Sequence, residues 1–545
     1  LRVGDFAQAA TAAGELAGAV PEAQPDPKAA IRAIGLVEKA FTDRGLEFDP
    51  TLFIFRENAP LKEPIDALLK KFDAVRTAVV REPEIINQNI AKLASGNLRE
   101  QGNAVAGLVR AGEVAVPAMV AKLKDATARD QHPSIQLALG QLRGSAIAPL
   151  IAVTESKDDE LVDKAMTALV SLQAQEATPW LVRIAEDRTR PALASRAVRL
   201  LANQGISVTT AKSADLFYMF AERFYYNAAG LRPDPRDNGK ARVWFYDDAN
   251  GGKLYPVEVP ADIYGDVQSM RYAEQAIKGG SGGDAVSLWL AANNKREAQL
   301  QAGQEPGLYK DPSAHFWNVK IGSQHVNQVL LRAMRDGAGR GLMAPAQRPV
   351  HTQVAMRAIK SLAEIVGQNS LNGSPLIEAM RYPDKVVRYE AALAVAGGLP
   401  QKPFQGQDRV VLLLAECLAQ NPTPGVLIMA PSADDVRRLG EGLGADIKSA
   451  GGTNAAEVVV QSARLPSVDV ILIAPGVNED ELRRFLVSAN ESPRFDHAAR
   501  VVIVKDQTSP WYQTAMADGR VTVVGTEVLP VPGGKPAAPG GAAPA

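Results

Sequence analysis

The chain has 545 residues, of which 46% are hydrophobic and 22% charged, so it has the composition of a folded protein and is too long for one compact core. Its 60 basic and 61 acidic residues give a formal net charge of -1, which argues against a general nucleic-acid binder with its dense basic stripe. The single cysteine, Cys417, excludes an internal disulfide and disfavours a thiolate zinc site. Because it lies in the apolar run 410–418, we expect it to be a small buried residue.

Residues 1–83 are expected to form an N-terminal helical segment or cap. The sequence opens at Leu1 and is rich in alanine, which fits either a mature end left after removal of a signal peptide or an arbitrary boundary. An exported location, periplasmic or in the cell envelope, is therefore favoured over a cytoplasmic one. No apolar run reaches the roughly 18 residues of a membrane-spanning helix, so no transmembrane segment is expected.

An internal repeat dominates residues 84–211. Its markers Gly112, Gly144, Ala174 and Gly205 are separated by 32, 30 and 31 residues. Other residues recur in register with these markers, namely Pro117, Pro149 and Pro179 together with Leu108, Leu139, Leu169 and Leu200. A period of this length predicts stacked helix pairs, each unable to bury its apolar face alone. We expect the glycines to close the first helices and the prolines to lie early in the second ones.

The segments AVAGLVRAGEVAVPAMVAKLKD and KAMTALVSLQAQEATPWLVRIAED resemble HEAT repeats, including the shorter kind found in phycobilin-lyase-like proteins. The pattern returns in residues 343–420, where SPLIEAMRYPDKVVRYEAALAVAGG is the most family-like stretch. The resemblance covers residues 84–205 and 350–420. It implies an α/α solenoid and says little about activity.

Residues 212–342 have a different sequence pattern. An aromatic-rich helix is predicted at 214–229, and the helices predicted at 267–277 and 284–300 resemble degenerate tetratricopeptide units. Between them, Asn250 and Gly251 separate two apolar runs and predict a β-hairpin at 243–259, because both residues tolerate positive φ. The hairpin is thus expected between the two halves of one repeat, an arrangement similar to that of uncharacterised HEAT-repeat proteins of planctomycete bacteria.

Trp244, Phe245 and Tyr246 are consecutive on the first strand of this predicted hairpin, so they point to both of its faces. One face is expected to pack on the solenoid and the other to stay exposed. Exposed aromatic side chains make interface anchors, so these three residues are the candidate partner-binding site. Trp289 and Trp317 are instead expected in the core.

Residues 421–528 contain the short apolar runs GVLIMA, VDVILIAP, RVVIVK and VTVV, which are typical of buried parallel strands. Helical segments opening at Ser432, Thr453 and Asn478 alternate with them. The pattern predicts a doubly wound α/β domain, and its order and lengths resemble the receiver domain of response regulators. Residues 529–545, rich in Pro, Gly and Ala, are predicted to be disordered.

The receiver resemblance implies a phosphate-accepting aspartate after the third strand, where this sequence has Ala474, Pro475 and Gly476. Asp434 and Asp435 lie near the end of the first strand, but they fit better as charges at a helix start. Phosphotransfer is therefore not expected, and the domain is predicted to serve as a docking module.

No other pattern predicts catalysis. Ser281 matches G-x-S-x-G, yet a helix precedes it where a nucleophile elbow needs a strand, so a loop between helices is expected. His315 and His325 could converge, but structural or surface roles are favoured. Acidic residues near the hairpin lack the order of a calcium loop and are expected to be solvated; they are Asp234, Asp237, Asp247 and Asp248. No catalytic residue, metal or cofactor is therefore expected.

The expected function is a non-catalytic scaffold or assembly protein that binds other proteins along the solenoid. One alternative is a signalling module that uses the degenerate receiver-like domain without phosphate. Another is a lyase or chaperone by analogy with phycobilin lyases, which rests on fold resemblance alone.

Overall fold

The structure is a computed structural model. It describes the chain outside residues 1–5, 22–25, 209, 228–232, 234–236, 238, 302, 305–306, 339–347, 366–370, 372, 420–423, 466, 493–494, 496–497, 505–520 and 526–545. The tail predicted at 529–545 lies outside the described residues. The contacts divide the chain into unit 1, Leu1–Val286 with Leu300–Lys310, and unit 2, Ser287–Gln299 with Asp311–Ala545.

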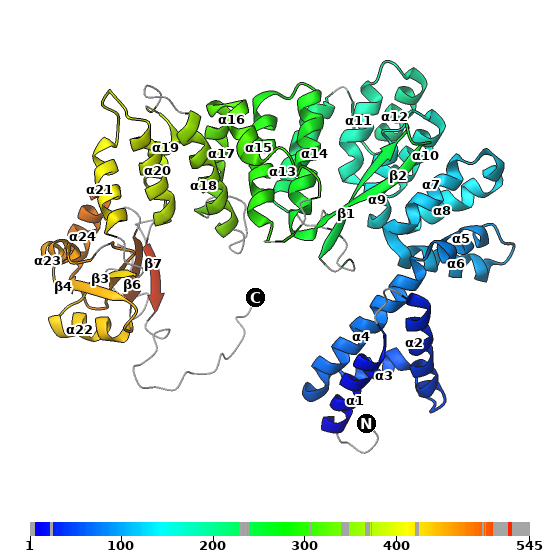
Figure 1. Ribbon diagram of the computed structural model, residues 1–545, viewed down its shortest axis with the longest axis horizontal. Helices are drawn as coiled ribbons and strands as arrows, with labels where there is room; N and C mark the ends of the chain where they lie inside the picture. The colour runs from blue at the N-terminus through cyan, green and yellow to red at the C-terminus, as the bar shows by residue number, and fades with distance from the viewer. Residues whose placement is uncertain are drawn as a thin grey trace. The chain divides into compact units, whose positions relative to one another are not determined.

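Unit 1 begins with four helices that enclose an apolar core (Figure 1). They are α1 (Phe6–Ala19), α2 (Pro27–Thr42), α3 (Phe48–Phe55) and α4 (Ala59–Val80). The buried face of α4 recurs at helical spacing and comprises Leu61, Ile65, Leu68, Phe72 and Val75. Phe72 stacks on Phe48 of α3, with ring centroids 4.6 Å apart. Burial of one apolar stripe per helix stabilises this part of unit 1.

Helix pairs follow. Their elements are α5 (Pro83–Lys92), α6 (Leu98–Ala111), η1 (Gly112–Ala115), α7 (Val116–Lys124), η2 (Ala126–Gln131), α8 (His132–Gln141), α9 (Gly144–Val153), α10 (Asp159–Ser171), η3 (Gln175–Ala177), α11 (Thr178–Glu186) and α12 (Pro191–Asn203). The first helices stack in succession, α6 on α8, α8 on α10 and α10 on α12. The four leucines that mark the repeat are all buried. The predicted array of stacked helix pairs is confirmed.

The turns within the pairs differ in detail from the prediction. Gly112 and Gly205 do have positive φ, at 68° and 76°. In the other two repeats the left-handed residue comes one position earlier than the predicted marker, at Arg143 (φ 50°) and Gln173 (φ 53°). A non-glycine residue in this conformation is costly, so the local turn is imposed by the stacking of the helices on either side.

The position of the proline within the second helix also differs between repeats. Pro117 and Pro179 lie in the first turns of α7 and α11, as predicted, because the 3₁₀ turns η1 and η3 precede those helices. In the middle repeat α9 already begins at Gly144, so Pro149 lies inside the helix.

By length and composition, one helical stretch among the described residues is long and apolar enough to cross a membrane, Leu98–Lys124. It comprises α6, η1 and α7, and the chain changes direction at Gly112. Its buried side chains, Leu108, Val116 and Met119 among them, belong to the core of the helix pairs. We therefore assign this stretch to the repeat array.

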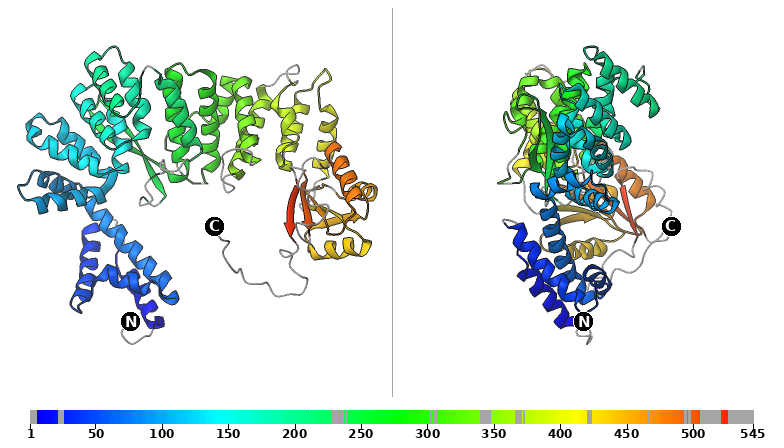
Figure 2. Two further views of the ribbon diagram at one scale, coloured as in Figure 1. Left: turned by 180° about the vertical axis from the view of Figure 1, so that it is seen from behind. Right: turned by 90° about the vertical axis from the view of Figure 1, so that its right-hand side faces the viewer.

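The predicted β-hairpin is confirmed, between α13 (Ser213–Tyr225) and α14 (Tyr264–Lys278), which pack on each other. β1 (Lys240–Asp247) pairs antiparallel with β2 (Lys253–Pro260), and η5 (Ala261–Ile263) leads into α14. β1 lies against α9 and β2 against α7, so the hairpin runs alongside the helix pairs (Figures 1 and 2). In the turn, positive φ occurs at Gly251 and Gly252.

The helices of unit 2 form a second array. The elements are α15 (Gly282–Gln299, which belongs to unit 2 from Ser287 on), α16 (Ala314–Ile321), α17 (Ser323–Gly337), α18 (Arg348–Ile365), α19 (Pro375–Ala379), α20 (Lys385–Gly397) and α21 (Gln407–Leu418). α17 packs on α18, α18 on α20 and α20 on α21.

Cys417 was expected to be buried, but on α21 it is only half-buried. In the same apolar run Val410 and Leu413 are buried, whereas Val411 and Leu418 are exposed. A continuous apolar run on a helix points side chains to every side, so a single packed face leaves the others uncovered.

Unit 2 ends in an α/β domain with a parallel five-stranded sheet of order β4-β3-β5-β6-β7. The strands are β3 (Gly425–Met429), β4 (Lys448–Gly452), β5 (Val470–Ile473), β6 (Ala499–Val504) and β7 (Val521–Gly525), and the helices are α22 (Ala433–Gly442), α23 (Ala455–Ser462) and α24 (Glu479–Glu491). Apolar clusters lie on both faces of the sheet. The fold class predicted from the sequence, a helical solenoid followed by a doubly wound α/β domain, is confirmed.

Candidate functional site

A chain of ion pairs fixes the base of the hairpin to the helix pairs of unit 1. Arg242 of β1 lies 3.1 Å from the carboxylate of Glu113 in η1 and 2.8 Å from that of Asp237. Asp237 also pairs with Arg81, which follows α4. These groups are largely buried, so their charges are weakly screened and their geometry is fixed.

Trp244 is the central contact of the hairpin. It is 1% exposed, and its Nε1–H donates to Glu113 Oε2 over 2.8 Å. On the other side, Arg271 of α14 donates to the Trp244 carbonyl over 2.7 Å and pairs with Glu155 at 2.9 Å. One strand is thus bonded both to the helix pairs and to α14.

The tip of the hairpin is fastened separately. Asp248 accepts from the Ser156 hydroxyl over 3.2 Å and from the Lys157 backbone N–H over 3.1 Å. Lys124 donates from Nζ to the Gly251 carbonyl over 2.5 Å. The hairpin is therefore held along its length by residues of two consecutive helix pairs, α6–α7 and α8–α9.

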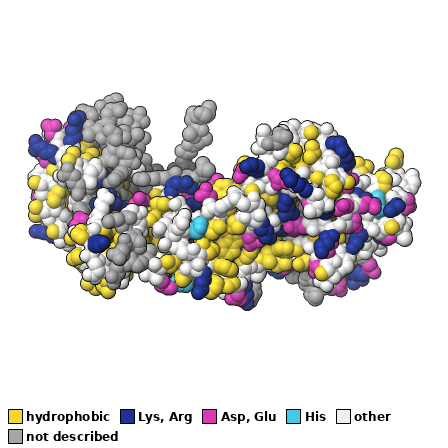
Figure 3. Space-filling view, turned by 90° about the horizontal axis from the view of Figure 1, so that it is seen from above, with side chains coloured by type: hydrophobic (Ala, Val, Ile, Leu, Met, Phe, Trp, Pro, Cys, Tyr) yellow, Lys and Arg dark blue, Asp and Glu magenta, His cyan; other side chains and the backbone are white. Residues whose placement is uncertain are grey.

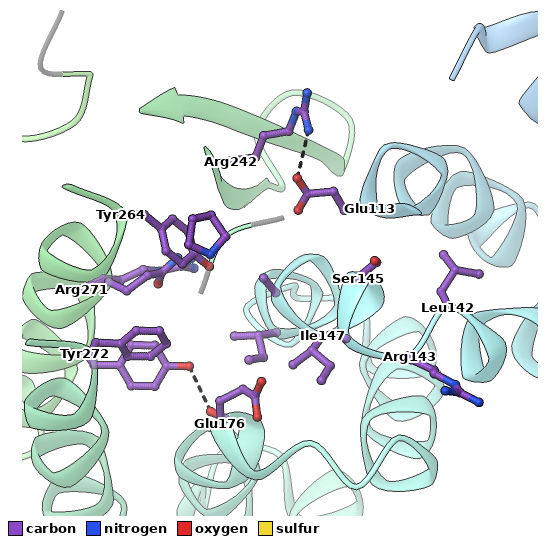
Figure 4. A pocket seen from close by; sticks show the side chains of 16 residues that line it. Glu113, Leu142, Arg143, Ser145, Ile147, Glu176, Arg242, Tyr264, Arg271 and Tyr272 are labelled. Carbon is purple, nitrogen blue, oxygen red and sulfur yellow. Dashed lines mark hydrogen bonds and ion pairs between the residues drawn. The ribbon is translucent and has the colours of Figure 1, made fainter. Parts of the chain in front are cut away.

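A cavity of about 360 Å³ lies between the hairpin, the helix pairs and α14 (Figure 4). Three side chains from successive turns of the repeat line it, Glu113, Ser145 and Glu176, and their spacings of 32 and 31 residues match the repeat period. The opposite wall comes from Arg242, Tyr264, Gln268, Arg271 and Tyr272. The sequence period therefore directs one side chain of each repeat into the same space.

The walls of this cavity combine rings and charges. Burial raises the pKa values of Tyr264 and Tyr272 far above their usual range, so both hydroxyls stay protonated. The Tyr272 hydroxyl donates to the Glu176 carbonyl over 3.0 Å. Burial also raises the pKa of Glu113, against the lowering effect of the hydrogen bonds from Trp244 and Arg242.

The three aromatic residues predicted to bind a partner lie in different surroundings. Trp244 is buried as described, whereas Phe245 and Tyr246 are half-buried. Phe245 stacks on Tyr255 of β2 with ring centroids 5.9 Å apart, and the Arg271 guanidinium lies 4.9 Å from the centroid of the Phe245 ring. The role of these residues in partner binding stays a prediction.

The residues of the cavity wall were not singled out from the sequence. Glu113, Ser145 and Glu176 carry a usable signal, because each directly follows or nearly follows a repeat marker at the turn of a helix pair. Arg242 and Arg271 carry none, since their places depend on how the hairpin and α14 pack against the array.

The histidines His315 and His325 bond to different partners. His315 lies 3.1 Å from the Ser361 hydroxyl and 3.1 Å from Glu364, whereas His325 lies 3.0 Å from the Ser287 hydroxyl. Ser361 is buried and donates to the Arg357 carbonyl of its own helix. The Ser361 hydroxyl therefore donates within α18, while His315 lies beside it through Nδ1 and contacts Glu364 through Nε2.

The acidic residues around the hairpin bind different partners. Asp247 caps the turn by accepting from the backbone N–H groups of Ala249 and Asn250, while Asp237 and Asp248 have the partners given above. Asp234 lies outside the described residues. Across the described part of the chain, no group of three or more His, Cys, Asp or Glu side chains is placed to hold a metal ion.

Ser281 lies in the turn between α14 and α15, with a helix rather than a strand before it. At the carboxyl end of the sheet, Ser432 caps α22 and donates to Asp435 over 2.6 Å. β5 ends at Ile473, and the next two residues of the chain are Ala474 and Pro475.

No protein-family model matches the chain, and a search of curated proteins found no similar sequence.

Proposed function

We propose that the protein is a non-catalytic scaffold that binds a partner protein in the cavity of unit 1. The observation that carries the proposal is the convergence of Glu113, Ser145 and Glu176, one from each of three successive turns, on a space closed by the hairpin and α14. The helix pairs also resemble HEAT repeats, whose stacking leaves extended binding surfaces.

The bonding within the walls favours binding over chemistry. Arg242 is held by the carboxylates of Glu113 and Asp237, and Arg271 is held by the carboxylate of Glu155 and the backbone carbonyl of Trp244. Side chains that are already ordered lose little freedom when a ligand arrives, which is the main benefit of preorganisation. A general acid or base would instead need a titrating group free to exchange its proton.

A protein is the partner class that the charges favour. Lys and Arg side chains are intermixed with Asp and Glu on the face shown in Figure 3, and the whole chain carries a formal net charge of -1. Mixed charge of this kind suits the polar rim of a protein interface, whereas nucleic acid requires a concentrated positive field.

The test is site-specific photo-crosslinking with the full chain in cells that naturally make it. A benzoylphenylalanine at Ser145, in the cavity wall, is expected to crosslink to one dominant protein. The same group at Leu137, which is 70% exposed on α8 and does not line the cavity, is the matched control and is expected not to capture that protein. Equal capture at both positions, or none at Ser145, would refute the scaffold role of this cavity.

A second candidate function is supported by the α/β domain. Its sheet order, with the second strand at the edge beside the first, is the order of flavodoxin-like domains, and the sequence resembles receivers. Val459 and Val460 of α23 and Val487 of α24 are exposed, which suits docking of a signalling partner without phosphate. Incubation with acetyl phosphate and Mg²⁺ is expected to leave the domain unlabelled, and labelling of residues 425–525 would contradict this candidate.

A further inference from the structure

We propose, resting on the proposed function, that the cavity of unit 1 holds the cationic end of an arginine or lysine side chain in a segment of the partner protein, with Glu176 as its counter-ion. The charges in the walls that already have a partner determine which group can enter the cavity.

Most of the charged side chains that line the cavity have an ion-pair partner. Glu113 is paired with Arg242, and Arg271 is paired with Glu155. Within the described residues Glu176 has no ion pair. Its carboxylate points into the space between Ile147 and the tyrosines of α14 (Figure 4). Glu155 is shared between Arg271 and Arg183, so among the buried and half-buried lining charges it is the Glu176 carboxylate that lacks an ion pair in the described residues.

The remaining charged residue of the lining is Arg143, and it does not alter this balance. Its side chain is exposed and points away from the other lining residues (Figure 4). An exposed charge at a rim is screened by water and contributes little to binding, whereas a half-buried carboxylate in a walled site interacts strongly with a cation.

The wall of the cavity formed by α13 and α14 is largely aromatic. The rings of Tyr264, Tyr272 and Phe224 line the cavity, and the faces of such rings attract cations. Gln268 is 4% exposed, and its side-chain amide hydrogen-bonds to Tyr264 within this wall. A carboxylate and ring faces are together groups that bind guanidinium and ammonium ions.

An anionic ligand fits the same walls poorly. It would face Glu176 and Glu113, and it would have to compete with Glu113 and Asp237 for Arg242, which both already contact at 3.1 and 2.8 Å. Replacing those buried partners leaves a buried carboxylate without its counter-charge, which is costly.

The experiment is isothermal titration of the full chain with capped tripeptides that differ at one position. Acetyl-Gly-Arg-Gly-amide is expected to bind at least about tenfold more tightly than its citrulline counterpart, which keeps the shape and removes the charge. The lysine peptide is expected to bind between the two. Equal binding of the arginine and citrulline peptides would overturn the proposal.

The variants locate the site. Glu176→Gln keeps the backbone carbonyl that accepts from Tyr272 and is expected to weaken the arginine peptide about tenfold. The control Glu63→Gln changes an exposed residue of α4 and is expected to bind as the wild type does. Unchanged binding by Glu176→Gln would overturn the assignment. If Glu176→Gln loses stability, the binding of the arginine and citrulline peptides to the wild type still tests the proposal.

The failure of this inference differs from a failure of the scaffold role. A partner that crosslinks at Ser145 while the arginine and citrulline peptides bind alike leaves the scaffold in place and removes the cation pocket. Charge-selective peptide binding without any crosslinked protein leaves the cation pocket in place and removes the scaffold role.

Discussion

Trp244 is the residue on which attachment of the hairpin depends most. Trp244→Phe removes the N–H that satisfies Glu113 and part of a buried ring, so we expect the free energy of unfolding of unit 1 to fall by about 1–3 kcal/mol. Tyr255→Phe on the same hairpin is the matched control, because Tyr255 is partly exposed, and it should change stability by less than about 0.5 kcal/mol. Urea denaturation followed by tryptophan fluorescence and circular dichroism measures both. An unchanged unfolding midpoint for Trp244→Phe would contradict the bonding described.

Glu113 makes stability depend on pH in a direction opposite to that of most carboxylates. Burial raises its pKa, so between the unfolded and folded pKa values the folded chain holds more protons, and stability is lost as the pH rises through the folded pKa. Glu113→Gln removes this loss. We therefore expect the variant to gain stability relative to the wild type as the pH is raised from about 4 to 7. A relative loss over that range, measured by thermal denaturation, would show that the pairing with Arg242 outweighs burial.

Single residues were predictable from the sequence only where the repeat fixed them. Leu108 and Leu169 were placed in the core by their period and are buried there. The sequence predicted that one face of the strand carrying Trp244 is packed and the other exposed, without saying which. Trp244 lies on the packed face, where its partner Glu113 comes from 131 residues away in the chain. Alternation along a strand says which side a residue faces and says nothing of what covers that side.

Among the elements, the hairpin turn is the most sensitive to backbone conformation. Gly251→Ala forces a Cβ onto a left-handed residue with open space around it and should cost about 1–2 kcal/mol. Gly252→Ala should cost more, because a Cβ there meets Lys124 Nζ and the Tyr246 hydroxyl and displaces the bond from Lys124 to Gly251. Gly251→Asn is the tolerated control. Equal unfolding midpoints for the two alanine variants would contradict the packing of this turn.

The elements were predicted best where apolar residues are dense. The helix pairs, the hairpin and four strands of the sheet follow from periodicity, but β4 does not. Its sequence KSAGG has no β-branched residue, and a Cβ on Gly451 would collide with the backbone of Ile428 in β3. Glycine is required there by close approach of a neighbouring strand, which only the assembled sheet reveals.

At the scale of the whole molecule, the two compact units should unfold in separate transitions. Asp469→Asn provides the test in unit 2. Burial tends to raise the pKa of Asp469, but hydrogen bonds from the Gly425 N–H and the Ser467 hydroxyl, with Lys385 nearby, hold it below its usual range. Its contribution is therefore present at neutral pH and lost as the pH falls through the folded pKa.

In calorimetry at pH 7, Trp244→Phe should lower only one transition and Asp469→Asn only the other, and the effect of Asp469→Asn should decline as the pH falls below about 4. The double variant should show both shifts, since distant sites are additive. A single transition lowered by both variants would contradict two independently stable units.

The central claim is that ligands enter unit 1 between the helix pairs and α14. Hydrogen–deuterium exchange of the full chain, with and without saturating acetyl-Gly-Arg-Gly-amide, tests it most directly. The account predicts slower exchange confined to residues 142–148 and 174–178 and to the start of α14. Protection confined to unit 2, or no change in those segments while the peptide is bound, would contradict it.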